Sequence, residues 1–190
     1  MKKKLLAICI LSALGTASVF AQTEANALQR NVNQQTRIEN GLKDGQLTTK
    51  EAGRLEKEQG RIDQLEAKDL KDGKLTARER AQLHRAQNRA SQDIKAADNN
   101  RAKGNPESLS SERMQADVQR DVNQQTRIAQ GVAAGTLNKR EAASLERGQA
   151  QLDRKEARAA RNGRVNANEQ RGIQASENAQ SKRIFAKKHN

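Results

Sequence analysis

Apolar residues recur along this chain at steps of three and four, the period of an α-helix with one buried face. In the first half, three such stripes follow one another: Leu28, Val32, Ile38 and Leu42; Ala52, Leu55, Ile62 and Leu65; and Leu83, Ala86, Ala90, Ile94 and Ala97. No stretch alternates with the period of two that is typical of a strand. The other positions hold mostly Gln, Glu, Lys, Arg and Ala, which favour helices. The pattern therefore predicts an all-α fold.

The second half of the chain repeats the first. The segment "NVNQQTRI" at Asn31–Ile38 returns as "DVNQQTRI" at Asp121–Ile128, and this offset of 90 residues holds without a gap to the C-terminus. The second set of stripes comprises Val118, Val122, Ile128 and Val132; Ala142, Leu145 and Leu152; and Ile173, Ala179 and Ile184. We interpret the chain as two duplicated modules, each of about three antiparallel helices.

Composition changes define the ends of these modules. Lys2, Lys3 and Lys4 precede the apolar run "LLAICILSALGTASVF", which predicts a signal peptide over residues 1–21 and a periplasmic or secreted protein. Module 1 then covers residues 22–98, and module 2 covers residues 112–190. The predicted linker, residues 99–111, contains the chain's single proline, Pro106. No stretch after residue 21 is apolar enough to span a membrane.

The predicted cores are thin, because Ala and Gln fill many positions in the apolar stripes. The glutamines are Gln35 and Gln59, with Gln125 and Gln149 as their repeats. After the signal segment the only aromatic residue is Phe185. We therefore expect loosely packed helices, possible self-association to cover the stripes, and no large catalytic cavity.

The segment "KDGQLTTKEA" and its repeat "KDGKLTARER" resemble the back half of an EF-hand loop, and this resemblance implies calcium as a cofactor. The ligands would be Asn40, Asp44, Thr48 and Glu51 in the first loop, and Asp72, Thr76 and Glu79 in the second. Leu42 stands at a ligand position and cannot bind a cation. The same letters also spell a helix end at glycine followed by a T-x-x-E capping box. We favour these helix corners over working calcium loops, and keep calcium binding as the alternative.

Two further resemblances rest on the same segments. The unit "RIENGLKDGQLTTKEAGRLEKEQGRI" followed by "LKDGKLTARERAQL" resembles small secreted proteobacterial proteins of unknown function. The "LTTKE" and "LTARE" motifs are similar to the L-T-x-x-Q motifs of the Spy and CpxP periplasmic stress proteins, with glutamate in place of glutamine. This second resemblance implies a chaperone or an envelope-stress role without ATP.

Positive charge concentrates in the second half. The chain has a formal net charge of +13. Residues 22–100 carry +2 of it, whereas residues 101–190 carry +8. The candidate anion-binding residues are Arg154, Lys155, Arg158, Arg161 and Arg164. This grouping indicates an anionic envelope surface or an acidic protein as partner. The predicted export and the missing DNA-binding motifs argue against specific nucleic-acid binding.

No catalytic arrangement is visible in the sequence. His84 and His189 are far apart, and neither has a second metal-binding residue at ligand spacing. Most carboxylates lie three or four residues from a Lys or Arg, which we interpret as solvated ion pairs. We therefore predict a non-enzymatic exported binding protein, a stress protein or chaperone that contacts unfolded clients or anionic surfaces. The alternatives are a calcium-binding protein using module 1 and a charged structural spacer.

Overall fold

The computed structural model describes residues 15–72 and 75–190, with side chains from residue 24 onward. These residues form six α-helices and one short 3-10 turn. Their bounds are α1 Gly15–Lys43, α2 Thr49–Asp69, α3 Ala77–Asp98, α4 Leu109–Ala133, α5 Lys139–Ala159, η1 Ala160–Asn162 and α6 Ala167–Lys188. The predicted all-α fold is confirmed. Most of the predicted signal segment lies outside the described residues, although residues 15–21 open α1.

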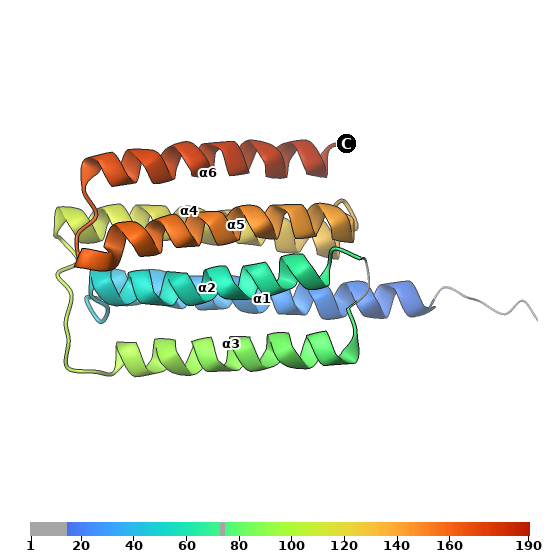
Figure 1. The fold of residues 1–190 in the computed structure, drawn as a ribbon, viewed down its shortest axis with the longest axis horizontal. Coiled ribbons are helices and arrows are strands. Elements are labelled where there is room, and N and C mark those ends of the chain that lie inside the picture. Colours follow the sequence, from blue (N-terminus) through green and yellow to red (C-terminus); the bar gives the residue numbers. More distant parts are fainter. Residues whose placement is uncertain (1–14, 73–74) are drawn as a thin grey trace, which may run out of the picture.

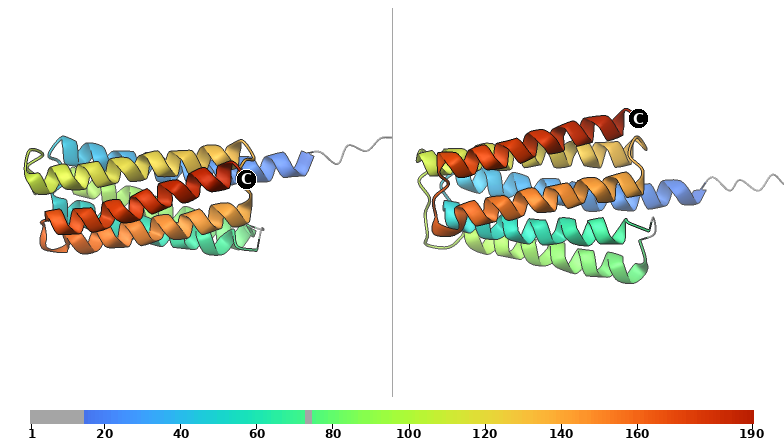
Figure 2. Two further views of the ribbon diagram at one scale, coloured as in Figure 1. Left: turned by 90° about the horizontal axis from the view of Figure 1, so that it is seen from above. Right: turned by 45° about the horizontal axis from the view of Figure 1, so that its top comes forward.

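The six helices lie side by side along one long axis (Figure 1). Helices α1, α2, α4 and α5 form a central four-helix bundle, in which α1 packs against α4 and α2 packs against α5. Helix α3 covers α1 and α2 on one outer side, and α6 covers α4 and α5 on the other, as the turned views also show (Figure 2). The two halves therefore meet through α1, α2, α4 and α5, whereas α3 and α6 each pack against helices of their own half.

Apolar packing is concentrated toward the two ends of this bundle. One cluster surrounds the α1–α2 corner, where Leu42 and Leu47 meet Met114 and Val118 from the second half. Another surrounds the α4–α5 corner, where Val132 and Leu137 share a cluster with Leu28. These corners lie at opposite ends of the molecule (Figure 1). Both clusters combine residues of the two halves, so the halves share their core. A third cluster joins Ala27 of α1 and Ile62 of α2 to α3. Many of the other buried side chains between the two ends are polar.

Capping boxes begin four of the helices. Thr48 with Glu51, Thr76 with Glu79, Asn138 with Glu141, and Asn166 with Glu169 each exchange the two hydrogen bonds of this motif. Three of the glycines that precede them, Gly45, Gly135 and Gly163, have the left-handed backbone of a helix C-terminus. Their repeat Gly73 lies outside the described residues. The predicted helix corners are thus confirmed.

No helix in the described part of the chain is long and apolar enough to cross a membrane.

Candidate metal centre

Acidic side chains fill the middle of the bundle. Twelve of the chain's 23 carboxyl side chains are buried. On α2, Glu56, Asp63 and Glu66 share one helix face with Gln59, because steps of three and four residues return to the same side of a helix. Their repeats on α5 are Glu146, Asp153, Glu156 and Gln149, which are buried in the same way. Because α2 packs against α5, the two acidic stripes meet inside the protein.

The buried carboxylates gather in two clusters. The four-carboxylate cluster consists of Glu56 from α2, Asp121 from α4, and Asp153 and Glu156 from α5. One oxygen of each lies within 4.8 Å of the others. The three-carboxylate cluster consists of Asp63 and Glu66 from α2 and Glu146 from α5, with oxygens within the same distance. Each cluster therefore takes its i, i+3 pair from one of the two facing helices and a glutamate from the other.

Small residues let the two acidic helices approach one another closely. A Cβ atom added at Gly60 would lie 3.0 Å from the Cβ atom of Asp153, and one added at Gly53 would lie 2.5 Å from that of Ala160. Real Cβ atoms do not approach other carbons at the shorter of these distances. The two glycines thus set the spacing at which carboxylates of α2 and α5 come together.

No basic side chain neutralises these clusters. Among the described residues, none of the seven cluster carboxylates has a Lys, Arg or His nitrogen within 4.0 Å. Burial raises the pKa of Glu56 and of Glu146 to about 8, although an amide donor beside each opposes the rise. For Asp121, Asp153 and Glu156, burial and then neighbouring carboxylates raise the pKa well above the usual range. The clusters therefore need protons or a cation to be stable at neutral pH.

The four-carboxylate cluster is the poorer in hydrogen-bond donors. Both oxygens of Asp121, Asp153 and Glu156 are buried without a donor, as is one oxygen of Glu56. Asp121 is close enough to Glu156 to share a hydrogen bond, but only if a proton is held between the two. The donor that the cluster does have is Gln35, whose Nε2 lies 2.9 Å from Glu56 Oε2. The six buried oxygens of these three side chains thus have no donor, and one oxygen of each lies within 4.8 Å of the others.

This donor set suits hard cations. Carboxylate oxygens are the protein ligands that Ca²⁺, Mg²⁺ and Mn²⁺ prefer. Helix bundles commonly build metal sites from inward-facing carboxylates on several helices, including residues three apart on one helix. Asp153 and Glu156 have that spacing on α5. Neither cluster contains the thiolate or imidazole ligands that softer metals favour.

The residues predicted as calcium ligands lie elsewhere, at the helix corners. Asn40 and Asp44 are exposed. Glu51 accepts hydrogen bonds from the backbone and hydroxyl of Thr48 at 3.0 and 2.7 Å, and from Asn100 Nδ2 at 2.6 Å.

The second corner behaves in the same way. Glu79 accepts the equivalent bonds from Thr76 at 2.8 and 2.7 Å, which lower the pKa of Glu79. Asp72 is exposed on the same corner. Glu51 and Glu79 thus each cap the helix that follows their corner. Calcium binding at these corners stays a prediction.

The structure places the predicted anion-binding residues at three places along α5 and η1. Arg154 lines a groove of about 300 Å³ between α2 and α5, together with Lys68, Lys71 and Arg147. Lys155 and Arg158 line a second hollow, beside α6. Arg161 and Arg164 are exposed near the end of η1.

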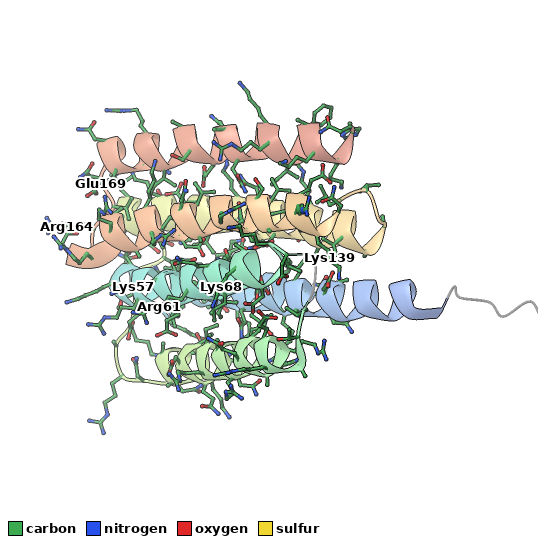
Figure 3. All side chains as sticks on the ribbon, turned by 45° about the vertical axis from the view of Figure 1, so that its right-hand side comes forward. Lys57, Arg61, Lys68, Lys139, Arg164 and Glu169 are labelled. Carbon is green, nitrogen blue, oxygen red and sulfur yellow. The ribbon has the colours of Figure 1, made fainter. Side chains whose placement is uncertain are left out.

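The outer surfaces of α2 and α5 are almost purely cationic. Along α2 the exposed side chains are Lys50, Arg54, Lys57, Arg61, Gln64 and Lys68. Along α5 they are Arg140, Arg147, Gln151, Arg154, Lys155 and Arg158. We call these ten Lys and Arg residues the cationic face, and Figure 3 shows Lys57, Arg61 and Lys68 following one another along α2. On these two helices the acidic residues are buried or half-buried. Basic groups therefore lie at the surface and carboxyl groups lie inside, a separation of charge by depth.

The carboxylate clusters were not predicted from the sequence. The interpretation of the acidic residues as solvated ion pairs is wrong for the seven cluster residues. A signal was present: Glu56, Gln59, Asp63 and Glu66 lie at steps of three and four beside the apolar residues Leu55 and Ile62. All four recur unchanged 90 residues later.

No protein-family model, curated protein or solved structure matches this chain.

Proposed function

We propose that this protein binds a hard metal cation, of the class of Ca²⁺, Mg²⁺ or Mn²⁺, in the four-carboxylate cluster. One observation carries the proposal: Asp121, Asp153 and Glu156 are fully buried, and none of their six oxygens has a hydrogen-bond donor. A buried charge is stable only when it is paired or bound to metal. A cation placed between these oxygens would satisfy all three side chains together.

Protons are the competing explanation for the cluster. Carboxyl groups that hold their protons can share hydrogen bonds with one another, and their raised pKa values favour that state. Shared protons can join Asp121 to Glu156 and Asp153 to Asp63 in pairs, but they supply no partner common to the four carboxyls that three helices bring within 4.8 Å of one another. A metal ion with six to eight oxygen ligands uses such an arrangement fully. We therefore expect metal binding to displace protons from the cluster.

Calorimetric titration of the full chain, stripped with EDTA, tests the proposal. The titrants are Ca²⁺, Mg²⁺ and Mn²⁺ at pH 7.5. We expect saturable binding of at least one ion and a higher melting temperature, because a ligand specific to the folded state stabilises it by about 2.7 kcal/mol at a hundredfold excess over Kd. The test variant is Asp121→Asn with Asp153→Asn, and its matched control is Asp44→Asn with Asp93→Asn.

The two variants separate the cluster from the corners. Asp44 is exposed and Asp93 is half-buried, and neither belongs to a cluster. Binding that disappears in the cluster variant and survives in the control supports the proposal. Binding that survives in the cluster variant, or no saturable binding of any of the three ions by the parent chain, would overturn it. Loss of metal binding in the control alone would favour the EF-hand-like corners as the binding site.

A second function, contact with an anionic surface, is supported by the cationic face. Lys68, Arg147 and Arg154 meet at the groove between α2 and α5, with no acidic residue among the residues that line it. Such a face attracts phosphate-bearing surfaces, and salt weakens that attraction. The predicted export is consistent with an envelope surface as partner, whereas contact with unfolded clients would rest on the sequence resemblance alone.

Vesicle sedimentation tests this second function. We expect binding to vesicles with anionic phospholipids at low salt, and none to neutral phosphatidylcholine vesicles. Replacing Lys68, Arg147 and Arg154 by Gln is expected to weaken binding more than replacing Arg85, Arg89 and Lys95 of α3, a control that removes the same charge. Equal losses in the two variants would show that net charge alone is responsible and would contradict a defined binding face.

A further inference from the structure

The two carboxylate clusters are built from equivalent positions of the sequence repeat. Glu56 corresponds to Glu146, Asp63 to Asp153 and Glu66 to Glu156. The clusters differ at the position that α1 or α4 contributes. Asp121 supplies a fourth carboxylate to one cluster, whereas its repeat is the amide Asn31. The chain thus contains two versions of one site, and a single contributed side chain separates them.

In the three-carboxylate cluster, Asn31 donates to two of the three carboxylates. Its Nδ2 lies 2.7 Å from Glu66 Oε2 and 3.3 Å from Asp63 Oδ1, so that one amide group joins two carboxylates. Gln125 does the same from α4, with its Nε2 at 3.1 Å from Asp63 Oδ2 and 3.2 Å from Glu146 Oε2. Both oxygens of Asp63 therefore have donors.

Gln87 of α3 holds this arrangement in place. Its Nε2 lies 2.7 Å from Asn31 Oδ1, which fixes the direction in which the Asn31 amide points. The same Nε2 lies 3.5 Å from Glu66 Oε1. Within the three-carboxylate cluster, Glu146 Oε1 is the one oxygen left without a donor among the described residues. Amide groups thus do in this cluster what a metal ion would otherwise do.

Two of the three equivalent positions around the four-carboxylate cluster hold no amide, and the third, Gln35, is the repeat of Gln125 and donates to Glu56 alone. Asp121 occupies the position equivalent to Asn31, and Glu177 of α6 occupies the position equivalent to Gln87. Neither can donate when ionised. Glu177 turns to Arg120, whose Nε lies 2.9 Å from its Oε2, rather than supplying a donor to the cluster. Two substitutions between the repeats have therefore exchanged donors for acceptors.

We infer that the chain binds one metal ion, in the four-carboxylate cluster. Two differences between the repeats decide which cluster binds it: Asp121 in place of Asn31, and Glu177 in place of Gln87. This inference rests on the proposed metal-binding function. The three-carboxylate cluster remains filled by amide groups and does not bind a second ion. Asp121 is a ligand. Glu177 is not a ligand; it acts indirectly, because it replaces the amide that Gln87 supplies beside the other cluster.

The number of bound ions tests the inference on the unaltered chain. Titration with Mn²⁺, followed by the loss of the free-ion signal in electron paramagnetic resonance, is expected to give one ion per chain, with the same count for Ca²⁺ by calorimetry. Two ions of similar affinity would overturn the inference and leave the proposed function intact. No bound ion at all would overturn both. This measurement needs no variant to fold.

Exchanging residues between the repeats tests the named positions. Asn31→Asp with Gln87→Glu gives the first half the residues of the second, and we expect a second ion to bind. Asp121→Asn with Glu177→Gln does the reverse, and we expect the remaining binding to weaken at least a hundredfold. Helicity by circular dichroism shows whether each variant has folded. A folded Asn31→Asp, Gln87→Glu chain that still binds one ion would contradict the assignment of these positions.

Discussion

Gln125 Nε2 lies 3.1 Å from Asp63 Oδ2, so an amide group of one half of the chain donates to a buried carboxylate of the other. This bond crosses from α4 to α2 inside the bundle, where buried polar side chains lie beside apolar residues such as Ile62. The halves are thus held in register by polar contacts as well as by apolar ones.

Replacing Asp121 by Asn is expected to stabilise the metal-free protein. Both oxygens of Asp121 are buried without a donor, and an amide can supply the donor that Asn31 supplies in the other cluster. We expect the free energy of unfolding at pH 8 to rise by about 1–3 kcal/mol, as measured by urea denaturation. The gain in stability on adding metal should disappear in the same variant. A variant that loses stability without metal would contradict this account of the cluster.

The metal-free protein is expected to be more stable near pH 5 than near pH 8. Burial raises the pKa of Glu56 and Glu146 to about 8, whereas an unfolded glutamate has a pKa of about 4.3. Below pH 4 both states hold the protons and stability is complete. As pH rises from about 4.3 toward 8, the unfolded state releases protons that the folded state keeps, so stability is lost.

Thermal melts between pH 4 and 9 measure this loss. Melting temperatures that rise steadily toward pH 8 in EDTA would show that the buried carboxylates are satisfied without protons. With a binding metal present, the loss should be smaller, since the ion replaces the protons.

Gly53→Ala and Gly172→Ala are expected to act in opposite directions. A Cβ atom at residue 53 would lie 2.5 Å from that of Ala160, so the substitution pushes α2 and α5 apart and should cost about 1–3 kcal/mol. No atom lies within 4 Å of a Cβ atom at Gly172 on α6, where alanine should add up to about 1 kcal/mol through helix propensity. Denaturant unfolding of both variants gives the comparison, and equal effects would contradict close packing of α2 on α5.

Thr76→Ala is expected to lower stability by about 1 kcal/mol, because the Thr76 hydroxyl accepts the backbone N–H of Glu79 at 3.2 Å and begins α3. Thr76→Ser keeps the hydroxyl and should retain most of that stability. We expect both variants to bind metal as the parent chain does. A calcium affinity that falls in Thr76→Ala and recovers in Thr76→Ser would point back to the corner as a metal loop.

Local sequence signals were sufficient for the helices and their corners. Stripes such as Leu28 to Leu42 and the capping pair Thr48 and Glu51 depend only on neighbours along the chain, so their structure follows from spacing. The buried carboxylates depend on which helices meet. Asp153 is an ordinary surface residue by type and neighbours, and only the packing of α5 on α2 beside Gly60 buries it. The spacing of the acidic residues is visible in the sequence, but the helix that buries them is not.

The separation of charge by depth affects how the protein moves in an electric field. The formal charge of +13 counts all 23 carboxyl groups as ionised. In the folded, metal-free protein the buried ones that keep their protons leave the chain more cationic than that figure. Metal uptake exchanges protons for a cation, which alters the total only slightly. Unfolding at neutral pH instead releases the protons, so the denatured chain should migrate more slowly toward the cathode for its size than the native one.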